Sequence, residues 1–452
     1  MIKKFSEWFM PYIGPLGRGT ISALSVNSLA LIVNFGLQVL LARALGSENL
    51  GAYSLVLAWL GVLLLFATFG IDSIFVRFVP KYEMSNQGGI LGALVYWGFK
   101  NAAKYALLIS LLIFLLVGIL WGTTSHLVLK TFIAGAVLLP IFTSLWIRQA
   151  LFRSLKQIIA ARLPDVVFKP LFFAALLFIY WWFQEFQMVS SPRAMLLHCV
   201  AAVTSLLLAI RLFRYDVPPH DETIDLKPHV AEWRASALPL LGVSVMIALA
   251  NEVDKIALGF FCPMSEVGQY SVAFRLSLFV SFGSDSILAM GVPLLSGALA
   301  SRSTEGFQKI TSKVSLWLLT VTLPLFIGVS LFGGEVLRLF GRDFGNSYSL
   351  LVILAAGQFA YSLNGVAGSI LVISNKPETL FRAALILLVG SVVLSSFAAY
   401  VGGSVAVAVV AATMLAVRGF LFSRIAKGLL SVETGGLFTL RYFFNLRKNR
   451  IP

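Results

Sequence analysis

Apolar stretches of span length alternate with short polar connections along the whole chain. A helix needs roughly 20 apolar residues to cross a bilayer. By that criterion the pattern predicts twelve transmembrane helices, near 20–42, 53–79, 102–121, 127–148, 165–184, 194–212, 236–261, 269–292, 313–333, 349–373, 380–401 and 403–424. We therefore expect an all-α integral membrane protein whose two termini lie on the same side of the bilayer.

The two halves of the chain share a repeated pattern. Matching residues recur at a constant offset of 217, namely Asn34 and Asn251, Gly51 and Gly268, Tyr53 and Tyr270, Ser54 and Ser271. A Phe-Gly-x-Asp-Ser-Ile motif at 69–74 recurs at 282–287, an offset of 213. A duplicated helical hairpin with a small insertion or deletion explains both offsets. Such duplication is typical of transporters built from two homologous halves, so we expect two pseudo-symmetric six-helix bundles.

Polar stretches divide this arrangement into segments. The longest one, 214–234, holds three prolines and mixed charges, and it predicts a cytoplasmic linker. The expected organisation is an N-terminal segment 1–19, bundles at 20–213 and 235–427, the linker 214–234, and a basic tail 428–452. Pro80 and Pro293 occupy matching places. Because proline ends or bends a helix, we expect in-plane helices over 88–100 and 296–310.

Composition supports the membrane assignment. Charged residues make up 12% of the chain, hydrophobic residues 58%, and mean hydropathy is +0.89, whereas soluble domains carry about 25% charged residues. The net charge of +15 does not indicate a nucleic-acid partner, because the basic residues are spread between spans. Of the 35 Lys and Arg residues, 27 fall on one side and 5 on the other. The positive-inside rule then places both termini in the cytoplasm.

The sequence offers little for catalysis. It lacks the G-x-x-x-x-G-K-[ST] loop of ATP-binding domains, and its four histidines are scattered. Cys199 and Cys262 lie in or beside predicted spans and imply no disulfide framework. We therefore expect no enzyme and no cofactor, but a secondary transporter that uses H⁺ or Na⁺ as its coupling ion.

Polar side chains inside spans are the candidate substrate-binding residues, because a charge at that depth costs about 3 kcal/mol on insertion scales. Asn34 and Gln38 lie four apart on one face of the first span. Asn251 and Lys255 hold the matching places in the seventh. Arg275, in the eighth span, lies at about the depth of Lys255. Two cations facing an internal cavity would suit an anionic ligand.

The carboxylates beside these cations leave an alternative open. Glu252 with Lys255, and Asp254 with Arg275, could neutralise one another in a helix-packing network. Glu252 and Asp254 are also candidates for binding the coupling proton or sodium ion.

Three further positions have both a functional and a structural interpretation. Asp72 and Asp285 hold equivalent places in the repeated motif, where they could form a gate with Arg77 or mark helix ends. Arg418 lies near the inner end of the last span, and it could face the cavity as a substrate-binding residue or extend its head toward the membrane surface.

The stretch LLARALGSENLGAYSLVLAWLGVLLLFATFGIDSIFVRFVPKY resembles the N-terminal signature of bacterial polysaccharide flippases. These belong to the multidrug/oligosaccharidyl-lipid/polysaccharide exporter superfamily. In this chain Gly51-Ala52-Tyr53 matches the turn after the first span, and Gly70 and Arg77 match the positions that follow. The C-terminal half shows the corresponding pattern at Asp254, Gly268, Tyr270 and Arg275.

The resemblance implies a V-shaped, MATE-like pair of six-helix bundles that alternates access to a cation-lined cavity. The implied substrate is an undecaprenyl-diphosphate-linked oligosaccharide repeat unit, as in O-antigen and lipopolysaccharide synthesis, carried across a bacterial inner membrane. Membrane lipids, a polysaccharide polymerase and a chain-length regulator are the implied partners.

Alternatives within the superfamily are a cation-coupled multidrug exporter and a lipid II flippase. An exporter of organic cations would use a carboxylate-rich cavity, whereas this chain carries at least as many basic groups. A lipid II flippase is expected to have fourteen spans. The alternative from a different class is a non-transporting scaffold or an enzyme of polysaccharide assembly, and the duplicated halves argue against a polymerase.

Overall fold

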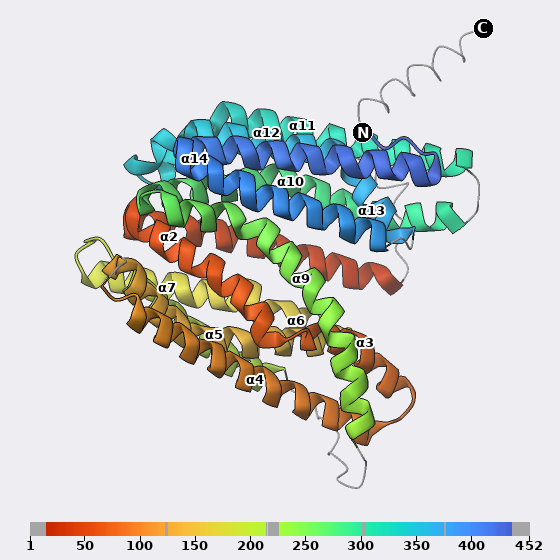
Figure 1. Ribbon diagram of the computed structural model, residues 1–452, viewed down its shortest axis with the longest axis horizontal. Coiled ribbons are helices and arrows are strands. Elements are labelled where there is room, and N and C mark those ends of the chain that lie inside the picture. The colour runs from red at the N-terminus through yellow and green to blue at the C-terminus, as the bar shows by residue number, and fades with distance from the viewer. Residues whose placement is uncertain are drawn as a thin grey trace. The chain divides into compact units, whose positions relative to one another are not determined.

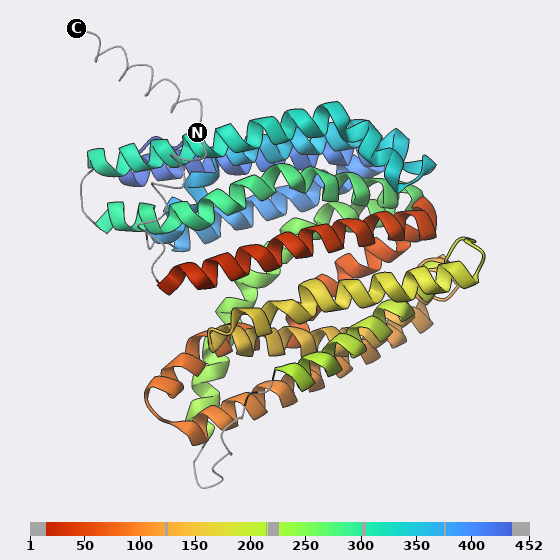
Figure 2. The same ribbon diagram turned by 180° about the vertical axis from the view of Figure 1, so that it is seen from behind.

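The computed structural model consists of helices and their connections throughout the part of the chain that it describes (Figures 1 and 2). That part comprises residues 15–122, 125–213, 215, 226–300, 304–374 and 377–435, with side chains from 29 onward except at 243, 285, 286, 289 and 377. Eight described helices, or nine counting one bent pair, are long and apolar enough to cross a membrane. Helix α14 carries two predicted spans, α2 carries the first and most of the second, and α10 carries the eighth. The predicted all-α membrane fold is confirmed.

The first compact unit is Met1–Ala248. Its elements are α2 (Pro15–Thr68), α3 (Ile71–Met84), α4 (Gly88–Ile119), α5 (His126–Ser154), α6 (Ile158–Leu163), the π-helix η2 (Pro164–Phe168), α7 (Lys169–Phe183), α8 (Ser191–Leu212) and the first part of α9 (Lys227–Phe261). Helix α5 packs against α2, α4 and α8, so it forms the centre of this unit.

The second unit is Leu249–Pro452. It contains the rest of α9, α10 (Met264–Ala300), α11 (Thr304–Phe340), the 3₁₀ helix η3 (Arg342–Ser347), α12 (Tyr348–Leu363), α13 (Gly365–Ile373) and α14 (Pro377–Leu430). Helix α12 contacts α10, α11 and α14, and α12 and α13 meet at a 46° bend. This unit therefore has its own helical core.

Glycine breaks divide the two longest helices into span-length pieces. Gly46 interrupts α2 at φ 71°, and Gly403 interrupts α14 at φ 61°, ψ −153°. The conformation at Gly403 is one that essentially only glycine adopts, and a Cβ there would lie 2.9 Å from a Glu266 carboxylate oxygen. Glu266 accepts a hydrogen bond from the Ser404 amide at 2.8 Å. Asn49, 217 residues earlier, accepts one from the Ser191 amide at 3.1 Å.

The predicted second span, 53–79, is broken inside its length at Phe69–Gly70, and the break is not at a proline. Phe69 and Gly70 have φ of 48° and 73°, whereas Pro80 lies inside α3 and Pro293 inside α10. The expected in-plane helices are therefore wrong, because 88–100 open the continuous α4 and 296–300 end α10. A Cβ at Gly70 would lie 2.8 Å from the carbonyl oxygen of Ala237, so this close backbone approach requires glycine.

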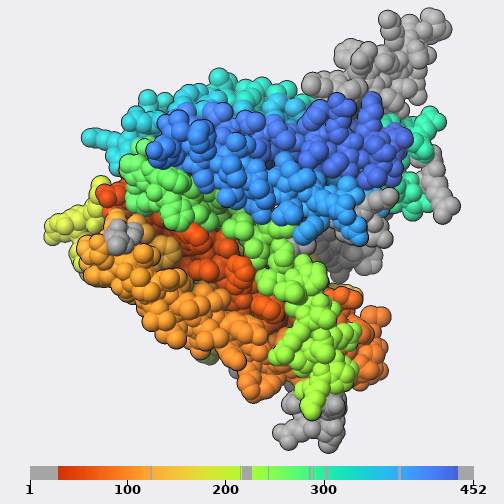
Figure 3. Space-filling view, in the orientation of Figure 1, coloured from red at the N-terminus to blue at the C-terminus, as the bar shows by residue number. Residues whose placement is uncertain are grey.

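The start of α9 belongs to the first unit. Trp233 is fully buried, and its Nε1 donates a hydrogen bond to the Tyr82 hydroxyl at 3.1 Å. Lys81 and Glu232 form an exposed ion pair at 3.3 Å beside it, and the first turns of α9 lie along α3 (Figures 1 and 3). The helix begins inside the predicted linker 214–234, and the unit boundary falls later, after Ala248.

The second unit also extends further than the predicted 427. Helix α14 continues to Leu430. Val432 and Thr434 beyond it are buried, and Glu433 and the Gln308 side chain exchange two hydrogen bonds, of 2.8 and 2.9 Å. These residues tie the end of α14 to the start of α11.

Candidate functional site

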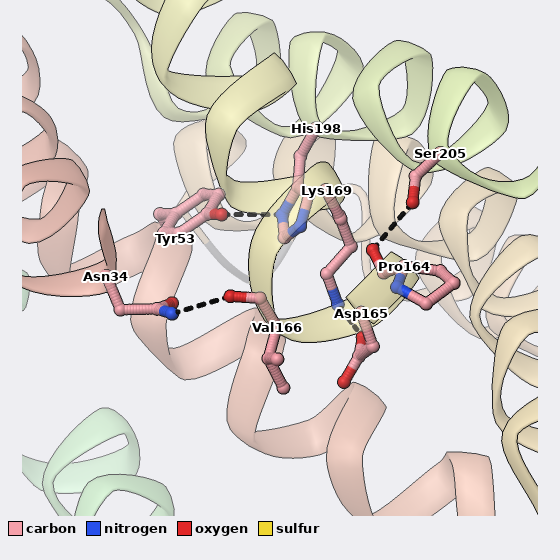
Figure 4. A network of polar contacts seen from close by, with 8 residues as sticks. All are labelled: Asn34, Tyr53, Pro164, Asp165, Val166, Lys169, His198 and Ser205. Carbon is pink, nitrogen blue, oxygen red and sulfur yellow. Dashed lines mark hydrogen bonds and ion pairs between the residues drawn. The ribbon is translucent and has the colours of Figure 1, made fainter. Parts of the chain in front are cut away.

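A cluster of polar side chains lies inside each compact unit. In the first unit we define the N-terminal polar cluster as Asn34, Tyr53, Asp165, Lys169 and His198 (Figure 4). These residues come from α2, η2, α7 and α8, so the cluster joins four elements that are distant in sequence.

The π-helix η2 shapes this cluster. It spans five residues, and the amide of Lys169 donates to the carbonyl of Pro164. Side chains from other helices also bind its carbonyls: Ser205 Oγ donates to Pro164 at 2.6 Å, and Asn34 Nδ2 donates to Val166 at 3.1 Å (Figure 4). π-Helical turns occur frequently at functional sites. Here the turn brings Asp165 and Lys169 into an ion pair.

His198 occupies a predominantly aromatic environment. Its ring stacks on Phe173 with centroids 4.5 Å apart and meets the ring of Phe142 edge-on at 5.2 Å. Its Nδ1 shares a hydrogen bond of 2.7 Å with the Tyr53 hydroxyl (Figure 4). The Lys169 ammonium lies 4.5 Å from the centroid of the Phe142 ring, so Lys169 and His198 contact the same aromatic ring.

The second unit contains the C-terminal polar cluster, which we define as Glu252, Asp254, Lys255, Tyr270 and Ser395. Asp254 accepts one hydroxyl bond on each oxygen, from Tyr270 at 2.9 Å and from Ser395 at 2.8 Å. Lys255 forms an ion pair with Glu252 one turn away. The structural alternative from the sequence therefore holds for Glu252 and Lys255, whereas Asp254 is bound by two neutral hydroxyl groups.

The remaining predicted cations, Arg275 and Arg418, belong to α10 and α14. Arg275 is an exposed residue of α10, near enough to Lys255 to interact with it electrostatically. Arg418 of α14 stacks its guanidinium over the Tyr361 ring at 4.2 Å, and its buried Nε has no hydrogen-bond partner. Arg418 thus contacts α12 and not the C-terminal polar cluster.

The other predicted positions are dispersed. Asp72 lies in the first turn of α3, where a carboxylate is favourable, and Arg77 stacks over Phe78 at 5.3 Å. No ion pair joins Asp72 to Arg77 in the described part of the chain. Gln38 is half-buried and Asn251 is exposed. Asp285 lies within continuous α10, and its side chain is outside the described residues.

The sequence did not identify three residues of the two clusters: His198, which binds Tyr53, Asp165, which pairs with Lys169, and Ser395, which binds Asp254. Asp165 and Lys169 lie four apart, a spacing that could have indicated their ion pair. Nothing in the sequence connects Tyr53 with His198 or Asp254 with Ser395, which are 145 and 141 residues apart. No group of three or more His, Cys, Asp or Glu residues able to hold a metal occurs among the described residues.

Sequence comparisons give a consistent pattern. The family model described as "Polysaccharide biosynthesis protein" matches residues 16–299. The "Probable low-salt glycan biosynthesis flippase Agl15" of Haloferax volcanii is 24% identical over 182 residues, which are 40% of this chain. That match spans only 39% of the relative's own length.

Solved structures show the same fold across nearly the whole chain. An inward-facing multidrug resistance MATE family transporter of the MOP superfamily aligns with a TM-score of 0.67 and 16% identity, covering 90% of this chain and 98% of that one. The lipid II flippase MurJ in an inward closed conformation aligns with a TM-score of 0.64 and 14% identity, covering 96% and 93%. The predicted MATE-like fold is confirmed.

Proposed function

Because this chain belongs to the polysaccharide biosynthesis protein family, we propose that it flips an undecaprenyl-diphosphate-linked oligosaccharide repeat unit from the cytoplasmic to the external leaflet by alternating access. The observation that carries the proposal is the family match over residues 16–299, together with the likeness to a glycan flippase. The MATE-like fold supports transport in general. It does not identify the substrate, because one fold can serve different substrates.

The polar side chains of this chain suit the groups of such a substrate that must be shielded from hydrocarbon. A diphosphate bearing sugars cannot enter hydrocarbon unaided, whereas its prenyl chain can remain in lipid. Cations must therefore replace water around the phosphates, and amides around the sugar hydroxyls. The cations in this proposal are Lys255, Arg275 and Arg418 of the second unit. The amides are those of Asn34, Gln38 and Asn251.

A coupling ion acts at Glu252 and Asp254 in this proposal. Carboxylate oxygens can bind Na⁺ as well as H⁺. The Asp254 carboxylate accepts hydrogen bonds from two neutral hydroxyl groups, those of Tyr270 and Ser395, and these do not neutralise its charge. Glu252 is the second ligand candidate, although its pairing with Lys255 must break before it can bind an ion. Gating by Asp72, Arg77 and Asp285 belongs to the same proposal, as do the inner-membrane location, the cytoplasmic termini and the polymerase and chain-length regulator as partners.

A vesicle assay tests the central claim. Purified protein is placed in liposomes with a polyprenyl-diphosphate-linked oligosaccharide carrying a fluorescent sugar, and transbilayer movement is followed by the access of a membrane-impermeant oxidant to that sugar. We expect protein-dependent movement that falls at least tenfold in Arg275→Ala and Lys255→Ala. Arg338→Ala is the matched control, because Arg338 is exposed and pairs with Glu335. Movement at the rate of protein-free vesicles would contradict the proposal.

Two further substrates separate the alternatives within the superfamily. Lipid II shares the diphosphate and polyprenyl parts but differs in its sugars and peptide, and a cationic dye represents the multidrug exporters. Faster transport of either one than of the linked oligosaccharide would favour that alternative over the proposed substrate.

A further inference from the structure

The tyrosine of the duplicated Gly-x-Tyr turn binds a titratable side chain in both units. Tyr53 and Tyr270 are 3% and 0% exposed. Tyr53 shares a hydrogen bond of 2.7 Å with His198, and Tyr270 donates one of 2.9 Å to Asp254. A buried tyrosine hydroxyl needs a polar partner. The same scaffold position thus serves an imidazole in one half and a carboxylate in the other.

Asp254 is the point where three helices of the second unit meet. Tyr270 binds its Oδ2 from α10, and Ser395 binds its Oδ1 from α14. The charged groups that face this carboxylate are Glu252 and Lys255, both on α9 and paired with each other. The carboxylate of α9 is therefore linked to α10 by one hydroxyl group and to α14 by another.

The two hydroxyl links lead to different parts of the unit. Tyr270 stacks on Phe274 with centroids 6.2 Å apart, and the Lys255 ammonium lies 5.8 Å from the centroid of the Phe274 ring. Arg275 is the next residue along α10. The link through Tyr270 therefore runs to the segment that carries the proposed headgroup cations, whereas the link through Ser395 runs to α14.

We propose that Tyr270 is a positioning residue: it couples ion binding at the Asp254 carboxylate to the position of the α10 segment that carries Arg275. The inference rests on the proposed ion-coupled transport. An ionised carboxylate only accepts hydrogen bonds, but a protonated one also carries a donor, and a bound Na⁺ occupies an oxygen lone pair. Ion binding at Asp254 therefore changes the ability of its Oδ2 to accept the hydrogen bond from the Tyr270 hydroxyl. Ser395 adjusts the ion affinity of the same carboxylate and does not transmit its state to α10.

The test measures the response of flipping to an ion gradient in the vesicle assay, with H⁺ and Na⁺ gradients imposed in separate arms. Tyr270→Phe keeps the ring and removes the hydroxyl. We expect its gradient-driven accumulation to fall roughly tenfold, the scale of one hydrogen bond to a charged group, toward the level of Asp254→Asn. Its exchange without a gradient should stay within about twofold of wild type. Tyr53→Phe, the same change in the other unit, should keep the gradient response.

Ser395→Ala provides a second measurement that does not depend on the stability of Tyr270→Phe. In the H⁺ arm it should lower the ion concentration for half-maximal response, because loss of a hydroxyl donor disfavours the ionised carboxylate, and it should leave the maximal response unchanged. A wild-type gradient response in Tyr270→Phe, an equal loss in Tyr53→Phe, or a lost maximal response in Ser395→Ala would overturn the inference. So would a wild-type protein that flips without responding to either gradient, which would also refute the coupling-ion part of the proposed function but leave the proposed flipping activity intact. No flipping by the wild type would refute both.

Discussion

Replacing Trp233 should reveal how firmly the start of α9 is attached to the first unit. The indole is fully buried in a core with Tyr82, Trp97 and Ala237, and its Nε1 binds the Tyr82 hydroxyl. Truncation of a buried tryptophan to alanine costs about 3–5 kcal/mol. The unpartnered Tyr82 hydroxyl adds roughly 1 kcal/mol. Trp233→Phe keeps most of the apolar contact and should lose only about the hydrogen-bond contribution.

A buried cysteine in the same unit provides the assay. Cys199 is 6% exposed, so a thiol-reactive dye reports its release on heating, in a Cys262→Ser background that removes the other thiol. A domain of this size loses about 2–4 °C of melting temperature per kcal/mol, so a loss of at least about 4 kcal/mol predicts a drop of roughly 8 °C or more for Trp233→Ala. Trp182→Ala is the matched control, because Trp182 is 59% exposed. Equal shifts for Trp233→Ala and Trp182→Ala would refute the claim that α9 is anchored by this residue.

Three other substitutions test local features. Asn34→Ala removes a hydrogen bond to the π-helix and should destabilise the first unit by about 1–3 kcal/mol, measured by the same dye; an unchanged melting temperature would show that η2 does not need this bond. Gly403→Ala should cost about 1–3 kcal/mol from backbone strain, whereas Gly428→Ala, which meets no neighbour, should be neutral in a thermal scan; equal effects would contradict the strained break. Gln308→Ala breaks both bonds to Glu433 and should speed proteolytic removal of the chain after α14; an unchanged cleavage rate would contradict the tie.

Local sequence signals were sufficient where the determining contact lies within one helix. The pairing of Glu252 with Lys255 follows from their spacing, because residues three apart share a helix face. The repeat of Tyr53 at Tyr270 likewise identified the duplicated hairpin. The structure contains the Glu252–Lys255 ion pair.

Proline and polarity were poorer guides to the boundaries. Pro80 and Pro293 lie inside helices, because neighbouring helices in a packed bundle supply the interactions that hold a proline-containing helix together. The polar stretch 214–234 suggested a linker, yet Trp233 within it is buried against α3 and α4. A short charged segment can therefore contain the start of a helix that packs against its neighbours through one large apolar side chain, here Trp233.

The sequence by itself determined the membrane class, the all-α fold and the internal duplication, since span length and repeat offset are one-dimensional properties. Only the tertiary structure decided which polar groups meet: Tyr53 with His198, Asp254 with Ser395, and Asn34 with the π-helix. The physical reason is that lipid-facing and core-facing positions of a membrane helix are both apolar, so the hydrophobic pattern does not reveal the rotation of each helix. That rotation selects the partner of every buried polar side chain.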